Sequence, residues 1–243
     1  MKALIKGFLD LLFARRCLAC GKVNPKGPFL YLCKDCAETL DLNLNARCLR
    51  CCEPLIGSAK DSTDTCVKCF GTKFYFEKSW CACLYKGAAC ELVKELKYHK
   101  GLYVLPDVAK IFAQNSGYFE FVDNAYLVPV PLHGKRLKKR GYNQSRKIAE
   151  ILAKQNPSIR GVLDLLARIK DTPTQTMLDR QNRVQNVKNA FAVKENALCD
   201  KNAKLVLLDD VMTTGATLNE CAKTLKKAGY KNISAMCFSK RAL

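Results

Sequence analysis

The sequence is poor in acidic residues and has no long apolar run. It contains 22 Asp and Glu against 41 Lys and Arg, a formal net charge of +19. No stretch approaches the roughly 18 apolar residues that span a bilayer. The N-terminal segment MKALIKGFLDLLFARR is interrupted by Lys6 and Asp10 and lacks a small-residue cleavage site, so it is a poor signal peptide. We therefore expect a cytoplasmic protein.

Residues 3–14 have apolar side chains that can share one helical face. We assign residues 1–16 to an N-terminal amphipathic helix that packs on the rest of the protein, with a membrane-surface helix as the alternative. The basic excess favours polyanionic partners, which include nucleic acid, an anionic membrane surface or a phosphorylated substrate. Net charge alone does not choose among these three classes.

The cysteine pattern predicts two structural zinc sites. There are 15 cysteines, an odd number, and most of the N-terminal ones form CxxC pairs, which favours metal ligation over disulfides. The expected ligands are Cys17, Cys20, Cys33, Cys36, Cys48, Cys51, Cys66 and Cys69. Sequential pairing makes two zinc ribbons over residues 17–72, although interleaved pairing and ligation by Cys52 stay open. Four thiolates leave no open coordination position, so the metal is structural.

Six further cysteines show no ligand spacing, and we expect them to be small buried residues without a function. They are Cys81, Cys83, Cys90, Cys199, Cys221 and Cys237. Two Cys₄ zinc sites would each carry about −2, and +19 − 4 leaves a charge of about +15. The protein therefore stays strongly basic when both metals are bound.

The most informative run is KLVLLDDVMTTGAT at residues 204–217. Its apolar residues 205–208 are typical of a strand buried on both faces of a parallel sheet. From Leu218 onward, apolar residues recur at helical spacing, and Gly229 ends the pattern. The intervening turn therefore lies where a strand passes into a helix.

This turn is suited to a ribose phosphate. Free amides at a helix N-terminus favour a phosphate, and glycine and hydroxyl side chains let it approach closely. The predicted phosphate-binding residues are Thr213, Thr214, Gly215, Ala216 and Thr217. Asp209 and Asp210 would repel a bare phosphate but can accept hydrogen bonds from two ribose hydroxyls, and Mg²⁺ could share the site. A Walker B interpretation is weak because the chain has no GxxxxGK[ST] loop.

Other patterns complete an α/β arrangement over residues 73–243. Strands are expected at 73–85, 125–130, 190–193 and 233–238, helices at 88–96 and 105–114, and a mobile flap at 168–191. After the 125–130 strand comes a basic loop at residues 135–147, which contains no acid. Its basic residues are Lys135, Arg136, Lys138, Lys139, Arg140, Arg146 and Lys147. Loops at strand ends of such sheets bind ligands.

Three stretches together resemble the ComF family, specifically its ComFC-like members. They are VPVPLHGKRLKKRGYNQSRKIAE, TPTQTMLDRQNRVQNVKNAF and VLLDDVMTTGAT, behind the CxxC region. The last also resembles the phosphoribosyl diphosphate (PRPP) motif of type I phosphoribosyltransferases. The family usually has Phe where this chain has Tyr142. The resemblance implies a double zinc ribbon joined to a phosphoribosyltransferase-like domain, and cytoplasmic handling of single-stranded DNA in natural transformation, beside inner-membrane uptake proteins.

Two main functional hypotheses follow, and a third, in which the zinc ribbons are a protein-docking module, can coexist with DNA handling. In a catalytic phosphoribosyltransferase of nucleotide metabolism or salvage, Asp209 and Asp210 would stabilise the ribosyl cation, while Lys97, Arg136 and Arg140 would bind the Mg-diphosphate. The sequence shows no nucleobase recognition element. We therefore prefer a nucleic-acid-handling protein that keeps a PRPP pocket. In it the basic loop would bind single-stranded DNA, with Tyr142, Tyr98 and residues near Trp80 as base-stacking platforms.

Overall fold

The computed structural model describes residues 15–23, 26–42, 47–55, 65–115, 117–172, 185–195 and 199–241. Five parallel strands form the central sheet in the order β1-β7-β6-β2-β3. Their bounds are β1 (Ser79–Leu84), β2 (Tyr126–Pro129), β3 (Gly161–Val162), β6 (Lys204–Met212) and β7 (Asn232–Lys240). The expected α/β class is confirmed. The predicted helix over residues 1–16 lies almost wholly outside the described residues.

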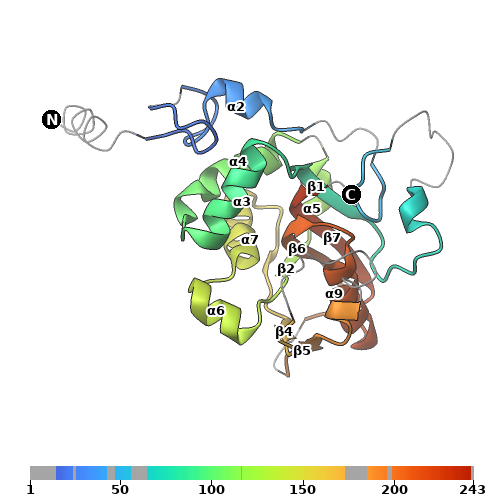
Figure 1. The fold of residues 1–243 in the computed structure, drawn as a ribbon. Helices are drawn as coiled ribbons and strands as arrows, with labels where there is room; N and C mark the ends of the chain where they lie inside the picture. The colour runs from blue at the N-terminus through green and yellow to red at the C-terminus, as the bar shows by residue number, and fades with distance from the viewer. Residues whose placement is uncertain are drawn as a thin grey trace.

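Helices cover both faces of this sheet (Figure 1). One face carries α3 (Ala88–Tyr98), α4 (Leu105–Ala113), α5 (Tyr118–Val122) and α7 (Gln144–Gln155), and the other carries α9 (Ala216–Lys227). Side chains along β6 alternate between the two cores. Val206 and Leu208 pack with the first group of helices, whereas Leu205 and Leu207 pack with α9. This burial on both faces explains the continuous apolar run.

A separate antiparallel hairpin pairs β4 (Leu166–Arg168) with β5 (Phe191–Val193) beside α9. The predicted strand at 190–193 is therefore confirmed. The flap expected at 168–191 is corrected at both ends, because Arg168 pairs with Phe191 between β4 and β5. Residues 173–184 of this predicted flap lie outside the described residues.

Two sequence predictions are corrected by the backbone. The strand expected at 73–85 covers only Ser79–Leu84. The basic loop expected at 135–147 is largely helical, since α6 (Gly134–Arg140) precedes α7. Gly141 ends α6 in the left-handed conformation with φ +86°, which glycine adopts without strain.

The cysteine-rich region contains little regular structure, chiefly α2 (Lys34–Glu38) and the 3₁₀ turn η1 (Val67–Cys69). Both parts of this region, the one with the first four predicted ligands and the one with the last four, are hydrogen-bonded to the α/β body. Asp107 on α4 accepts hydrogen bonds from the amides of Leu30 and Tyr31, each at 2.8 Å. In the second part, the Leu49 carbonyl accepts from the Ser79 amide at 2.6 Å. The predicted division at residue 72 stays a prediction.

Candidate functional site

A cavity of about 210 Å³ lies at the carboxyl ends of β2 and β6. Ligands of parallel α/β sheets bind at this edge. The charged residues that line it are Asp209, Asp210, Lys97, Arg136, Arg140, Arg168 and Arg241. Its uncharged lining includes Tyr85, Tyr98, Leu132, Thr213 and Thr217. Five basic side chains against two acids favour an anionic ligand.

Asp210 is held by a lysine from the neighbouring helix. Lys97 Nζ, near the C-terminal end of α3, lies 2.9 Å from Asp210 Oδ1. Burial opposes the charge of Lys97, but the attraction of Asp210 outweighs burial and raises the pKa of Lys97. Asp210 is only 3% exposed, and its Oδ2 has no hydrogen-bond partner among the described residues. In the structure Lys97 therefore forms an ion pair with one of the two acids. The predicted binding of Lys97 to diphosphate stays a prediction.

Asp209 is easier to protonate than an ordinary aspartate. Its Oδ1 accepts hydrogen bonds from Ser145 Oγ at 3.1 Å and from the Asp210 amide at 2.9 Å. Burial, followed by the negative charge of Asp210, raises the pKa of Asp209 to about 6. The side chain is therefore mostly ionised at neutral pH. An ionised carboxylate only accepts hydrogen bonds, as binding to sugar hydroxyls requires.

The turn after β6 places hydroxyl groups beside these acids. Thr213 and Thr217 line the same cavity as Asp209 and Asp210. Gly215 has φ +80° immediately before α9, so a side chain there would be strained. Thr214 is buried, and its Oγ1 accepts from the Ala216 amide at 3.3 Å. Thr214, Gly215 and Ala216 thus shape the turn but are not among the lining residues.

Arg136 and Arg140 reach the cavity from α6, as part of the predicted set. Arg136 donates a hydrogen bond to the Thr172 carbonyl, and Arg140 donates one to Gln144 Oε1 at the start of α7. These bonds orient both guanidinium groups while leaving them in the cavity lining. Arg–anion contacts at this position remain a prediction.

Sequence reasoning missed two basic residues of the cavity. Arg168 ends β4, and its buried Nε has no hydrogen-bond partner among the described residues. Burial, followed by repulsion from Arg136, lowers the pKa of Arg168. Arg241 directly follows β7, and its amide donates to the Met212 carbonyl at 2.9 Å. The parallel pairing of β7 with β6 could have indicated Arg241, whereas no local pattern indicates Arg168.

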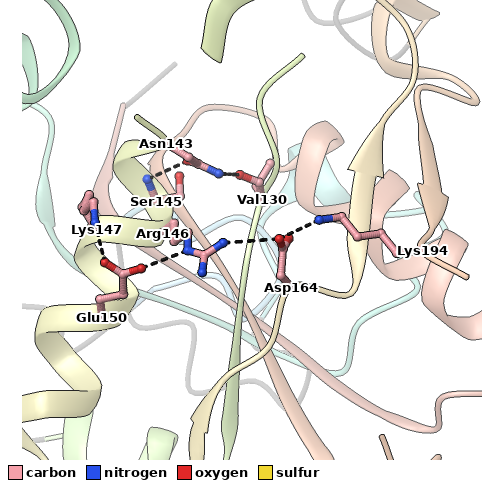
Figure 2. Close-up of polar contacts among 8 residues, drawn as sticks. All are labelled: Val130, Asn143, Ser145, Arg146, Lys147, Glu150, Asp164 and Lys194. Carbon is pink, nitrogen blue, oxygen red and sulfur yellow. Dashed lines mark hydrogen bonds and ion pairs between the residues drawn. The ribbon is translucent and has the colours of Figure 1, made fainter. Parts of the chain in front are cut away.

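The start of α7 is fixed by a capping residue (Figure 2). Asn143 Oδ1 accepts from the Ser145 amide at 3.0 Å, and Asn143 Nδ2 donates to the Val130 carbonyl at 2.9 Å. An Asn cap satisfies a free amide at the helix N-terminus. Here it also ties the helix to the end of β2. Ser145 is thereby held where its hydroxyl reaches Asp209.

The basic residues of 135–147 divide into ion-paired and unpaired groups. Figure 2 shows Arg146 between Glu150 and Asp164, and Lys147 beside Glu150. The Arg146 nitrogens lie 2.9 Å from Glu150 and 3.3 Å from Asp164, and Lys147 Nζ lies 2.8 Å from Glu150 Oε2. Lys135 lies 3.2 Å from Asp171. Lys138 and Lys139 are exposed and have no ion pair within the described part of the chain. These two lysines leave positive charge available on α6.

The cysteines form two tetrads in sequential order. Cys17, Cys20, Cys33 and Cys36 form one, and Cys48, Cys51, Cys66 and Cys69 form the other. Within each tetrad all ligand atoms lie within 4.8 Å of one another, so each could hold a metal ion. The interleaved pairing is therefore wrong.

Cys52 is not part of either tetrad. Its Sγ lies 3.1 Å from Ser79 Oγ, and the side chain is buried. Cys81, Cys83, Cys221 and Cys237 are buried as predicted. Cys90 and Cys199 are only partly buried, so the prediction of burial is wrong for these two.

The predicted stacking platforms differ in exposure. Tyr98 lines the cavity and is 67% exposed. Tyr142 is half-buried, and its hydroxyl donates to the Leu96 carbonyl at 2.7 Å. Trp80 packs against Phe112, with 5.7 Å between ring centroids, as part of the core on the α3 and α4 face. Trp80 itself therefore contributes to the core, and stacking by residues near it stays a prediction.

Comparison with known proteins supports one family. Competence protein F from Haemophilus influenzae is 38% identical over 107 residues, which are 44% of this chain and 46% of that protein. Competence protein ComFC from Streptococcus pneumoniae is 26% identical over 206 residues, 82% of this chain and 78% of that protein. The names of these relatives and the two cysteine tetrads support the ComF family for this chain. Another relative is the DNA utilization protein YhgH from Salmonella typhimurium, 30% identical over 152 residues, 60% of this chain and 64% of that protein.

These alignments cover only part of the relatives' chains. The chain spans 46% of competence protein F and 64% of the Salmonella typhimurium YhgH protein, less than two thirds of either. No family model matches the chain. These relatives are named for competence and for DNA utilization. Within the described residues, every helix is too short or too polar to cross a bilayer.

Proposed function

We propose that this ComF-family protein binds a ribose phosphate, with PRPP as the best candidate, and handles incoming single-stranded DNA during natural transformation. The observation that carries the proposal is the shared cavity of the acidic pair, the hydroxyl-bearing turn and five basic side chains. The family names supply the link to DNA uptake. Association with inner-membrane uptake proteins belongs to the same proposal.

Each part of PRPP would meet a chemically matched part of the cavity. Asp209 and Asp210 would accept hydrogen bonds from the ribose hydroxyls. The turn Thr213–Thr217 would bind the 5′-phosphate, and the arginines would bind the diphosphate. Mg²⁺ bound with the diphosphate would supply further charge neutralisation. Lys97 would orient the Asp210 carboxylate through their ion pair.

We assign zinc to both cysteine tetrads. Four thiolate ligands within one small segment suit tetrahedral zinc and leave no position for a substrate. The metal would hold the cysteine-rich region together, because that region has little helix or strand of its own.

Calorimetry with PRPP and Mg²⁺ tests the ligand site. The Asp209→Asn/Asp210→Asn variant should bind PRPP about 100-fold more weakly, because two charge-assisted hydrogen bonds to the ribose become neutral ones. Asp200→Asn removes an exposed charge far from the cavity lining and should bind like the wild type. Equal affinity of all three proteins, or no binding by the wild type, would refute the site.

A catalytic transferase is the second candidate, favoured by the tyrosines Tyr85 and Tyr98 in the cavity lining. An acceptor base could stack on these rings while Asp209 and Asp210 stabilise positive charge on the ribose. Release of diphosphate from PRPP in the presence of a panel of nucleobases distinguishes catalysis from binding alone. No release with any base would leave the binding function and exclude transfer to those acceptors.

A further inference from the structure

A buried lysine joins the cysteine-rich region to the turn after β6. Lys240, the last residue of β7, is 0% exposed. Its Nζ lies 3.1 Å from Glu53 Oε2 and also donates a hydrogen bond to the Thr213 carbonyl. One ammonium group therefore connects three distant segments of the chain.

Burying an ammonium is costly unless it is paired and hydrogen-bonded. Lys240 meets this requirement with one carboxylate and one carbonyl. Glu53 is in turn fixed by its own surroundings. Its carbonyl accepts from the Cys48 amide at 2.9 Å, and its Oε1 lies 3.3 Å from Lys68 Nζ. The position of the Glu53 carboxylate thus depends on the segment that carries the second tetrad.

Other contacts bring the same segment against the turn. Asn219 on α9 accepts from the Tyr75 amide at 2.7 Å and donates to the Lys73 carbonyl at 3.0 Å. Phe74, between those two residues, packs on the second cysteine tetrad. A Cβ built on Gly215 would lie 3.8 Å from the Arg50 carbonyl and 3.8 Å from the Phe74 ring. The turn is therefore backed by residues adjoining the second tetrad.

We propose that Glu53 and Lys240 are positioning residues that hold the Thr213–Thr217 turn in its ligand-binding conformation. The inference rests on the proposed ribose-phosphate function. The Thr213 carbonyl would repel a phosphate if it faced the ligand. Lys240 does not line the cavity, so its hydrogen bond holds this carbonyl outside the space that the ligand would occupy. In this arrangement the second tetrad segment controls affinity without touching the ligand.

The test compares Lys240→Met and Glu53→Gln with a matched control, Lys22→Met. Lys22 forms an exposed 3.0 Å pair with Asp35 beside the first tetrad, so its loss changes the charge equally. PRPP binding should weaken by at least about 10-fold in Lys240→Met, since small displacements of binding groups are costly. Glu53→Gln should weaken it less, because glutamine keeps a polar oxygen beside the Lys240 ammonium. Lys22→Met should leave it unchanged.

Hydrogen exchange of the turn without ligand provides a second readout. Amides of residues 213–217 should exchange faster in Lys240→Met and Glu53→Gln than in the wild type and Lys22→Met. The effect of Glu53→Gln on both readouts should shrink in the Lys240→Met background, as expected for coupled residues. If Lys240→Met does not fold, Glu53→Gln alone decides the test.

The two proposals fail in different ways. Lower thermal stability with unchanged PRPP affinity and unchanged exchange at 213–217 would overturn the positioning role. If wild-type protein does not bind PRPP, the proposed function fails, while the exchange data still decide whether Glu53 and Lys240 hold the turn.

Discussion

Asp209 carries its charge in an environment that disfavours it. Burial and the neighbouring Asp210 raise its pKa from 3.8 to about 6. The folded state therefore binds more protons than the unfolded state between these two pH values. The stabilisation from protonated Asp209 is complete below about pH 4 and is lost as pH rises through about 6. At neutral pH, the ionised side chain costs stability but can accept hydrogen bonds from a sugar.

Substitution by asparagine should reveal this cost. Asp209→Asn keeps an oxygen for Ser145 Oγ and the Asp210 amide but removes the charge. We expect the free energy of unfolding to rise by about 1–3 kcal/mol at pH 7.5 and to match the wild type near pH 4. Denaturant unfolding at both pH values measures this difference.

The control for this prediction is Asp164→Asn, a half-exposed acid paired with Lys194 at 2.6 Å. It should not stabilise the protein at either pH, because Asp164 gains from its basic neighbours. Equal stability of Asp209→Asn and wild type at pH 7.5 would contradict the raised pKa.

At the scale of elements, adjacent cysteines have different roles. Cys51 belongs to the second tetrad, whereas the side chain of Cys52 contacts Ser79 on β1. We expect two zinc ions per wild-type chain, one in Cys51→Ser and two in Cys52→Ala, as measured by elemental analysis of the purified proteins.

Stability should follow the metal content. A missing structural zinc removes binding energy that holds its segment folded, so Cys51→Ser should lose several kcal/mol of unfolding free energy. Cys52→Ala should lose only about 1–2 kcal/mol, as for a small cavity. Full metal content in Cys51→Ser would show that the tetrad is not the binding site.

Local sequence patterns predicted the elements that have a simple signature, such as a continuous apolar run or a fixed cysteine spacing. The run 205–208 reads as a doubly buried strand, and the CxxC spacing indicates the eight tetrad cysteines. Helix α6 was missed because six of its seven residues are glycine or basic, with Leu137 as the only apolar one. Only its C-terminal end carries a stop signal, Gly141, which is also compatible with a loop.

At the scale of the whole molecule, tertiary pairing determines what local patterns cannot. Arg168 enters the cavity because β4 pairs with β5, and the intervening sequence carries no sign of that pairing. Lys240 and Glu53 are far apart in the chain, and only the folded structure brings them into one ion pair beside the turn. Trp80 could stack on bases by its residue type, but in the structure it packs against Phe112.

Tertiary contacts also determine which basic side chains are available to a ligand. The formal charge of +19 does not show which lysines can contact a polyanion. Arg146 and Lys147 are already bonded to acids, as Figure 2 shows. Exposed Lys138 and Lys139 on α6 have no such acid among the described residues. If single-stranded DNA binds beside the cavity, its phosphates should contact these two lysines first.

Two double variants with the same change of charge test this expectation. The logarithm of single-strand affinity should fall steeply with the logarithm of salt concentration, by about 0.7 for each phosphate contact. Lys138→Ala/Lys139→Ala should therefore reduce the slope by about 1.4, whereas Arg146→Ala/Lys147→Ala should change it little. Filter binding of a labelled oligonucleotide at several salt concentrations gives the slopes. Identical slopes for both variants would mean that DNA responds to net charge and not to the unpaired lysines of α6.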